Sequence, residues 1–420
     1  MSPAPVPSTP LPSTPVPSAA SFDPWRPAFV ADPYPAYAEL RAQGRALYFA
    51  RSDQWLIPHH ADVSTLLRDR RLGRTYLHRF SHEEFGRQAP PPEHEPFHTL
   101  NGNGLLDLEA PDHTRIRRLI SMAFTPRTVE RLAPTVTRLA EELAARFVAA
   151  GGGDLVAEVA EPLPVAVIAE MLGVPEADRA LLRPWSSAIV GMFELNPGEE
   201  TARRAVRASE EFSAYLRGLI AERRGALGDD LISALISAHD EEDQRLTEQE
   251  MISTCVLLLN AGHEATVNTT SNGWLTLFRH PEQLATLRAE RETLLTTAVE
   301  ELMRFDTPLQ MFERWVLDDI EVGGTVIPRG SEVALLFGSA NRDPARFEHP
   351  DTLDLARTDN AHLTFGAGIH YCLGAPLARL ELAASFGALL RRAPGLRLTA
   401  EPEWNPGYVI RGPRELRVEV

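Results

Sequence analysis

The sequence contains no lysine, so all 42 of its basic residues are arginines. A Walker-type phosphate loop needs its lysine, and this class of nucleotide-binding site is therefore excluded. Acidic residues number 58, which gives a formal net charge of −16. Nucleic-acid-binding domains normally carry a basic patch or stripe, so we do not expect this chain to bind nucleic acid.

Cysteine is almost as scarce, with only Cys255 and Cys372 in 420 residues. Two cysteines without CxxC spacing exclude a disulfide scaffold and a thiolate zinc finger. No stretch approaches the ~20 consecutive apolar residues of a membrane-spanning helix. The first 20 residues are rich in Pro, Ser and Ala and lack the basic start and apolar centre of a secretory signal. We expect a disordered tail over residues 1–20, a single domain over residues 21–420 and a cytoplasmic location.

The remaining pattern is typical of a mainly helical protein with a smaller β region. The stretch 73–110 contains a triple proline and two Asn-Gly pairs, so we expect an irregular and functional loop there. The other expected elements are helices over 36–44 and 61–71, short strands within 46–57, nearly continuous helix over 112–295, and strands over 315–322, 332–337 and the carboxyl end.

The clearest single element is a helix over residues 248–278. Thr247 and Glu250 form a capping-box pattern just before an apolar run. His280-Pro281 ends the helix, because the residue before a proline is disfavoured in the helical region. About 30 residues at 1.5 Å each give a rod of roughly 45 Å, which must cross the whole domain. Cys255 falls in this apolar run and is expected to be a core residue.

Cys372 has unusual surroundings, since residues 365–374 read FGAGIHYCLG. Glycines at this density allow positive φ and let the backbone approach a flat ligand closely. Loop amides directed at the sulfur would stabilise a thiolate, which is the form that binds metal. A cysteine thiolate can be the proximal ligand of haem iron. The alternative is that Cys372 is a small buried hydrophobic residue.

This segment resembles the haem-binding loop of the cytochrome P-450 family, F-G-x-G-x-H-x-C-x-G, at every fixed position. The resemblance extends over roughly residues 22–420. It implies the family's mainly α fold, with a long distal helix over a haem b group bound through Cys372. It also implies that the loop residues Phe365, Gly366, Gly368 and Gly374 shape the haem slot.

The middle of the long helix reads AGHEAT over residues 261–266. His263-Glu264 would open a zinc-binding HExxH motif, but Val267 stands where the second histidine is required. The segment instead resembles the family's oxygen-binding groove, where Gly262 leaves space for O₂ and an acid followed by an alcohol relays protons. Glu264 matches the acid, whereas Ala265 replaces the usual threonine.

Thr266 cannot simply substitute for that threonine, because one residue turns a side chain by about 100° around a helix. Our hypothesis is that a substrate hydroxyl or an ordered water supplies the missing hydrogen bond. The catalytic set expected from the resemblance is Gly262, Glu264, Ala265 and Thr266.

Two further groups of charged residues match family motifs. Glu301 and Arg304 match the family's E-x-x-R, lie on one helical face, and would form a buried triad with Arg357. Loss of one member should prevent haem incorporation, because an unpaired buried charge is costly. His113, Arg117, Arg314 and His370 match the residues that bind the two haem propionates, a chemically sensible set of donors.

The substrate pocket is expected on the side of the haem opposite Cys372. Its polar anchors would be Gln310 and Asn103, in a cavity for a medium-sized apolar molecule. The walls expected by family position are Phe97, Leu100, Leu258, Ala261, Leu309, Gln310, Phe312, Val409 and Ile410.

The resemblance implies a haem-thiolate monooxygenase that activates O₂ and oxidises, by preference hydroxylates, an apolar organic substrate of secondary metabolism. Electrons would come from a ferredoxin and its reductase, because no flavin or nicotinamide domain is recognisable in the chain. Arg115, Arg118 and Arg379 would offer that donor a basic face. The protein is expected to be monomeric. The alternatives are oxidative coupling, desaturation or peroxide-driven oxidation at the same site, and a non-catalytic haem protein that binds a ligand.

Overall fold

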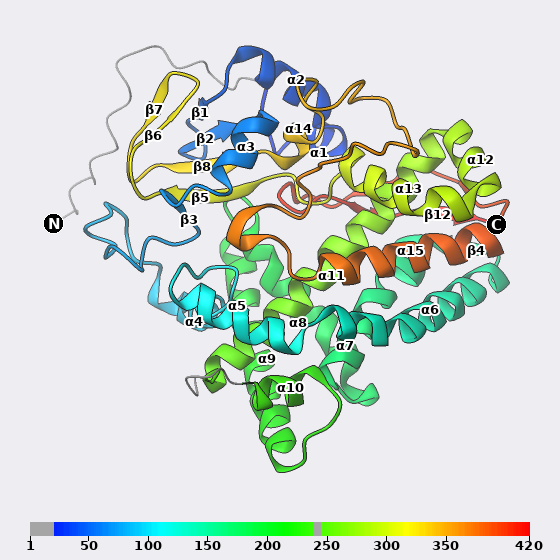
Figure 1. Cartoon of the computed structure of the whole chain (residues 1–420), viewed down its shortest axis with the longest axis horizontal. Helices are drawn as coiled ribbons and strands as arrows, with labels where there is room; N and C mark the ends of the chain where they lie inside the picture. Colours follow the sequence, from blue (N-terminus) through cyan, green and yellow to red (C-terminus); the bar gives the residue numbers. More distant parts are fainter. Residues whose placement is uncertain (1–20, 239–244) are drawn as a thin grey trace.

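The computed structural model describes residues 21–238 and 245–420. The tail expected over residues 1–20 lies outside this range. Helices dominate, and the sheets are small; the five-stranded sheet lies on one side of the molecule, whereas β4 and β12 lie near the opposite edge, by the C-terminus (Figure 1). The expected fold class is therefore confirmed. Within the described residues, no helix is both long and apolar enough to cross a membrane.

Most helices lie in the middle of the chain, and longer connections separate α3 from α4, α13 from α14 and α14 from α15. Their bounds are α1 Pro27–Ala31, α2 Tyr34–Gln43, α3 His60–Leu66, α4 Glu95–Gly102, α5 Asp112–Ala123, α6 Pro126–Ala149, α7 Pro162–Leu172, α8 Arg179–Val190, α9 Glu199–Gly225, α10 Leu231–Ser237, α11 Glu248–Arg279, α12 Pro281–Ala289, α13 Arg291–Phe305, α14 Phe337–Ala340 and α15 Ala375–Arg392. Single turns of other helix types occur at η1 Pro92–His94, η2 Val156–Ala160, η3 Glu176–Asp178, η4 Gly191–Phe193 and η5 Gly368–His370.

The largest sheet has five strands in the order β1-β2-β8-β5-β3. Only β2 and β8 pair in parallel; the other neighbours are antiparallel. The strand bounds are β1 Leu47–Phe49, β2 Gln54–Ile57, β3 Leu72–Gly73, β4 Gly152–Asp154, β5 Phe312–Val316, β6 Ile320–Val322, β7 Thr325–Ile327, β8 Glu332–Leu335, β9 Arg397–Leu398, β10 Glu403–Trp404, β11 Pro413–Glu415 and β12 Arg417–Glu419.

The long helix α11 runs through the middle of the molecule, with α7, α8, α13 and α15 packed around it (Figure 1). Its 32 residues give a length of about 48 Å. Both halves of the expected capping box are present, with the Thr247 side chain accepting from the Glu250 N–H and Glu250 accepting from the Thr247 N–H. The helix ends at Arg279, before His280-Pro281, as expected. Cys255 is fully buried in the core.

Three sequence expectations need correction. The stretch 73–110 is not wholly irregular, because Pro96 in the first turn of α4 is compatible with a helix start and Phe97 and Leu100 bury one face. The helix expected to reach residue 71 ends at Leu66. The strand expected over 315–322 is interrupted by a bend at Leu317-Asp318 and forms parts of β5 and β6.

The charged triad lies beneath the segment that leads to Cys372. Arg304 donates from Nε and Nη2 to the two oxygens of Glu301, each at 2.7 Å, and both side chains are fully buried. Arg357 Nε donates to the same carboxylate at 3.2 Å. The remaining Nη1 group of Arg304 donates to the carbonyls of Asn341 and Pro350. The pair therefore ties α13 to two loops that precede the cysteine.

Arg304→Ala is expected to lower the free energy of unfolding by about 3–5 kcal/mol, because it leaves the Glu301 carboxylate buried without its main partner. Urea unfolding followed by circular dichroism measures the change. Arg203→Ala is the matched control, since Arg203 and Glu200 are also three residues apart on a helix but solvent-exposed. The control should leave the unfolding midpoint nearly unchanged. Equal midpoints for the two variants would refute the structural role of the triad.

Candidate active site

Cys372 lies on a tight loop immediately before the N-terminus of α15. The loop closes through a hydrogen bond of 2.9 Å from the Cys372 N–H to the Phe365 carbonyl. Gly366 and Gly368 have φ values of 68° and 70°, a region that L side chains rarely adopt. A Cβ on Gly368 would also lie 2.4 Å from the Leu67 carbonyl, so this glycine lets the loop pack against the end of α3. Local backbone geometry therefore explains two of the four loop residues predicted from the sequence.

The electrostatic environment of the Cys372 thiol contains opposing effects. Burial raises the pKa of the thiol, whereas the N–H groups of Gly374 and Ala375 and the nearby Arg117 and Arg379 lower it. The stabilising groups are those expected at a helix N-terminus, where amides point at an anion. A cation held at the sulfur would further favour the thiolate, since a coordinated thiol is deprotonated.

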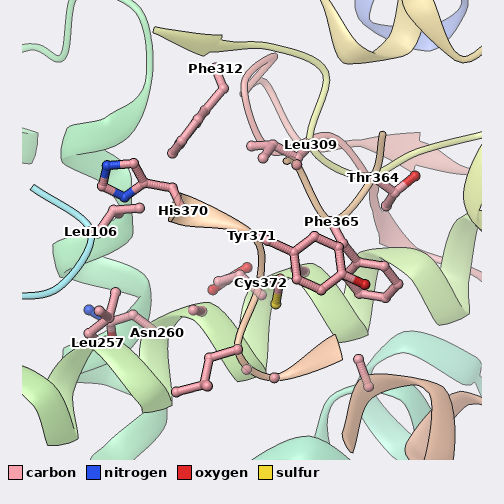
Figure 2. A pocket seen from close by; sticks show the side chains of 18 of the residues that line it. Leu106, Leu257, Asn260, Leu309, Phe312, Thr364, Phe365, His370, Tyr371 and Cys372 are labelled. Carbon is pink, nitrogen blue, oxygen red and sulfur yellow. The ribbon is translucent and has the colours of Figure 1, made fainter. Parts of the chain in front are cut away.

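A cavity of about 320 Å³ separates Cys372 from the middle of α11. Gly262, Glu264, Ala265 and Thr266 all contribute to its lining, as does Cys372. Figure 2 shows Cys372 with Phe365 and Tyr371 on one side, and Asn260 and Leu257 on the helix. The two motifs that the sequence singled out, more than 100 residues apart, therefore border one space.

The cavity has a basic end, where His113, Arg314 and His370 come together. The rings of His113 and His370 are 4.5 Å apart. His113 is buried with its Nε2 atom unpartnered, and burial lowers its pKa to about 4. Arg314 is also buried, its Nη1 donates to the Glu313 carbonyl at 2.8 Å, and burial lowers its pKa to about 9.

Arg117 joins this end of the cavity from α5. Its Nη2 group donates to the Tyr371 carbonyl at 2.7 Å, and it lines the cavity. Burial lowers its pKa, and the neighbouring Cys372 raises it. All four residues predicted for the propionates therefore border the same cavity as the thiol.

Two residues at the basic end carried no recognisable sequence signal. Glu109 accepts from His370 Nε2 at 3.2 Å and from the Arg74 N–H at 2.7 Å. Burial raises the pKa of Glu109, but these two donors outweigh burial and leave the pKa below its ordinary value. Arg74 lines the cavity, and its Nε atom is buried without a partner.

These residues fit a flat dianionic ligand with a metal at its centre. Buried donors without acceptors, the His113 Nε2 and Arg74 Nε atoms, are costly unless an acceptor is supplied. Two carboxylates at the basic end would satisfy them, and Cys372 offers a soft ligand to the metal. Among the described residues no group of three or more His, Cys, Asp or Glu side chains could hold a metal ion without such a cofactor.

The Glu264 side chain is hydrogen-bonded to a residue of α8. Ser187 Oγ donates to its Oε1 atom at 2.9 Å, and His263 Nδ1 lies 3.7 Å from the same oxygen. His263 is almost fully buried, and its Nε2 atom lies 3.8 Å from Glu161. The carboxylate therefore borders the cavity while its hydrogen bond fixes it to a neighbouring helix.

Thr266 is directed toward α15, where it interacts with the carboxyl group of Glu381. This contact agrees with the prediction that Thr266 does not substitute for the missing threonine. Glu381 is a buried acid that the sequence did not reveal; it lines the cavity, and its Oε1 atom has no partner. Burial raises the pKa of Glu381 to about 8, so it is mostly protonated at pH 7.

The expected substrate pocket is only partly reproduced. Leu258, Ala261, Leu309, Phe312, Val409 and Ile410 line the cavity. Phe97 and Leu100 do not, because they pack into the core beneath α4. Gln310 is fully buried and bonds to Tyr37 and the Thr307 carbonyl. Asn103 donates to the Thr99 carbonyl at the end of α4, so neither polar anchor borders the cavity.

Gly262 has a packing role as well as a place in the cavity lining. A Cβ at this position would lie 3.0 Å from Ile168 on α7, so glycine allows close contact between α7 and α11. Gly374 differs, because a Cβ there would meet only the Cys372 sulfur at 3.9 Å. Contacts within the protein therefore explain the glycine at 262 but not the one at 374.

The fold is mainly helical, a loop cysteine faces a long helix, and donors without partners lie at one end of the space between them. Together these features define the class of haem-thiolate proteins. The sequence signature described as cytochrome P-450 matches residues 186–393. The cytochrome P-450 monooxygenase PikC of Streptomyces venezuelae is 41% identical over 399 residues, which cover 93% of this chain and 91% of PikC.

Nocardicin C N-oxygenase of Nocardia uniformis is 41% identical and covers 92% of this chain and 95% of its own. The solved structure of the bacillaene polyketide synthase cytochrome PksS from Bacillus subtilis has a TM-score of 0.84 and 34% identity, covering 95% of this chain and 99% of PksS. The chain belongs to the cytochrome P-450 family and is a P-450 monooxygenase with a haem-thiolate cofactor.

The raised pKa of Glu381 leads to a testable pH dependence. The native state holds this proton up to about pH 8, whereas an exposed glutamic acid loses it near pH 4.5. The acid therefore makes stability fall as pH rises between these values, by about 1.4 kcal/mol per pH unit. Glu381→Gln should remove this slope, so the unfolding free energies of wild type and variant should diverge from pH 5 to pH 8 in urea titrations. A constant difference between them would show that Glu381 is ionised in the native protein.

Proposed function

We propose that the protein inserts one atom of O₂ into a medium-sized, largely apolar organic substrate, with hydroxylation as the main outcome and a role in secondary metabolism. The observation that supports this most directly is the cavity shared by the Cys372 sulfur and the AGHEAT segment of α11. The proposed cofactor is haem b, and the proposed domain is residues 21–420. When bound, haem with a thiolate ligand supplies reductive activation of O₂, with thiolate donation favouring O–O cleavage.

The residues around the cavity have distinct proposed roles. Cys372 ligates the iron, and Phe365, Gly366, Gly368 and Gly374 shape the slot for the macrocycle. His113, Arg117, Arg314 and His370 bind the propionates, with Arg74 as an additional donor. Support comes from the buried, unpartnered His113 Nε2 and Arg74 Nε atoms at this end. Glu301, Arg304 and Arg357 hold the cysteine loop in place without taking part in the chemistry.

Glu264 is the proposed proton donor on the distal side. Its hydrogen bond to Ser187 connects it to α8. His263 lies close to both Glu264 and Glu161, and Glu161 in turn forms an ion pair with Arg183. Ala265 also lines the cavity but offers no hydroxyl, which leaves a gap in the proton path from this acid. A substrate hydroxyl or an ordered water is proposed to fill it, and Glu381 with Thr266 offers a second protonated acid on the α15 side.

The substrate would occupy the apolar part of the cavity. Leu258, Ala261, Leu309, Phe312, Val409 and Ile410 form its walls, and Asn260 adds a polar atom, Oδ1, without a partner. The relatives include a nocardicin C N-oxygenase and a polyketide biosynthesis cytochrome. A tailoring reaction on a bulky natural product is therefore the proposed setting.

Electrons are proposed to come from a ferredoxin and its reductase, in the cytoplasm, with this chain as a monomer. Docking next to Cys372 would use the exposed side chains of Ile369 and Tyr371. The basic face expected from the sequence needs revision, because Arg115 pairs with Glu250 and Arg379 pairs with Glu300. These acidic partners largely compensate the local positive charge, so apolar contact is proposed to contribute more to docking of the electron donor.

A peroxide-driven or other haem-thiolate reaction, such as oxidative coupling or desaturation, is the second candidate. The absence of a hydroxyl at Ala265 favours it, because ordinary proton delivery lacks one member. Product formation with hydrogen peroxide alone, equal to that with the complete electron-transfer system, would identify this alternative.

The thiolate ligand can be tested with the two cysteines of the chain. The dithionite-reduced protein under carbon monoxide is expected to show the strongly red-shifted Soret band of thiolate-bound haem, and Cys372→Ala should lose it. Cys255→Ala should retain it, since Cys255 is buried away from the cavity and burial raises its pKa to about 12. A band at the position of histidine-ligated haem in the wild-type protein would refute the assignment.

Position 265 tests how protons reach the cavity. With a substrate whose hydroxyl fills the gap, Ala265→Thr should change product formed per electron very little. With the analogue lacking that hydroxyl, it should raise this ratio by at least about tenfold, since general acid–base catalysis typically contributes about 10²–10⁴-fold. Ala265→Val is the matched control, with the same shape but no hydroxyl. An equal gain with both compounds would contradict substrate assistance.

A further inference from the structure

The segment of residues 405–411, here called the C-terminal wall, is held firmly along one edge. Its Val409 carbonyl accepts from the Gln310 N–H at 2.9 Å, and its Arg411 N–H donates to the Pro308 carbonyl at 2.7 Å. The hydroxyl groups of Tyr408 and Tyr37 are 2.7 Å apart in the core. Val409 and Ile410 project into the cavity lining. One side of this wall is therefore fixed to the rest of the protein.

The other side of the C-terminal wall is bonded by a single carboxylate. Glu194 Oε2 accepts from the N–H groups of Tyr408 and Val409 at 2.8 and 3.0 Å, and Oε1 accepts from the Ile410 N–H at 3.0 Å. Three successive backbone donors on one anion form a concave anion site of the kind that backbone amides build. Hydrogen bonds to an ionised acceptor are stronger than neutral ones.

Gly407 makes room for this carboxylate. A Cβ at position 407 would lie 2.7 Å from Glu194 Oε1 and 2.8 Å from its Cδ atom. Since Gly407 does not have a positive φ, backbone conformation does not account for the glycine. The close approach of the Glu194 side chain accounts for the glycine at this position.

Glu194 belongs to a second wall of the same cavity. It directly follows η4, which continues α8, and the preceding residues Val190 and Phe193 line the cavity. The chain then runs through residues 195–198 to α9. Residues 191–198, the α8–α9 connection, are thus attached to the C-terminal wall through Glu194. The cavity walls contributed by α8 and by the carboxyl end are joined at this point.

The attachment carries an electrostatic cost as well as a gain. Burial raises the pKa of Glu194 despite its three N–H donors, and the nearby Glu313 carboxylate adds to the rise. The ionised side chain thus pays a desolvation cost that opening of the connection would relieve. No opposite charge compensates it among the groups that affect its pKa most.

We propose that Glu194 is a clasp that closes the α8–α9 connection onto the C-terminal wall and thereby controls how fast ligands enter and leave the cavity. The inference rests on the proposed function in one respect, namely that the cavity between Cys372 and α11 receives the substrate. It assigns Glu194 a gating role, which does not require the side chain to touch the bound ligand.

The test uses the haem-loaded full chain and 4-phenylimidazole, an azole that shifts the haem absorption band on reaching the iron. Stopped-flow absorbance yields its association and dissociation rate constants. Glu194→Gln should raise both by about tenfold, the change that a loss of ~1.4 kcal/mol in the clasp produces, with much less effect on the equilibrium affinity. Glu199→Gln, the same replacement at a glutamate whose side chain is 96% exposed at the start of α9, should leave both rates unchanged.

Gly407→Ala provides an independent variant, because its methyl group would occupy the place of the carboxylate. It should also raise both rate constants, and it decides the question alone if Glu194→Gln fails to incorporate haem. Wild-type rates in Gly407→Ala and Glu194→Gln would overturn the proposal. A rise in the dissociation rate alone would also overturn it, since Glu194 would then stabilise the bound ligand instead of gating the cavity. Failure to form product from any substrate would refute the proposed function but leave these rates measurable.

Discussion

The buried pair of Glu301 and Arg304 is the interaction on which the position of the cysteine depends. Its partners include Arg357 and the carbonyls of Asn341 and Pro350, and Asn341 in turn accepts from the Leu363 N–H at 2.7 Å. Thr364, the neighbour of Phe365, donates to the Met303 carbonyl on the same helix. A charged centre inside α13 thus fixes both the approach to the cysteine loop and its first residue. Buried ion pairs often add little net stability, and geometric specification of a functional loop is the role best supported here.

Features governed by local chemistry were predictable from the sequence. The capping box of Thr247 and Glu250 and the end of α11 before Pro281 involve neighbours in the chain, and both were confirmed. The glycine-rich loop around Cys372 was also legible, because positive φ at Gly366 and Gly368 is a local requirement. The helix α4 was missed because the prolines and glycines around it suggested a loop, whereas burial of its apolar face stabilises a helix.

The contacts that could not be predicted are the long-range ones made by partly or fully buried acids. Glu109, Glu194 and Glu381 resemble any other glutamate in the sequence, and their surroundings arise only when distant segments meet. The polar anchors expected at Gln310 and Asn103 failed for the related reason that each has partners elsewhere in the protein. The cavity consequently owes its charge pattern to tertiary structure, whereas the loop that carries Cys372 follows from a local motif.

The close contact between Gly262 and Ile168 has a consequence for how the cavity can adapt to ligands of different bulk. The Ile168 side chain fills the space beside Gly262, and interiors packed this tightly transmit strain instead of absorbing it. Any expansion therefore has to come from the opposite boundary, where shorter segments meet through polar contacts. A bulkier ligand is thus expected to displace the C-terminal wall and the α8–α9 connection, and not the packed helices α7 and α11.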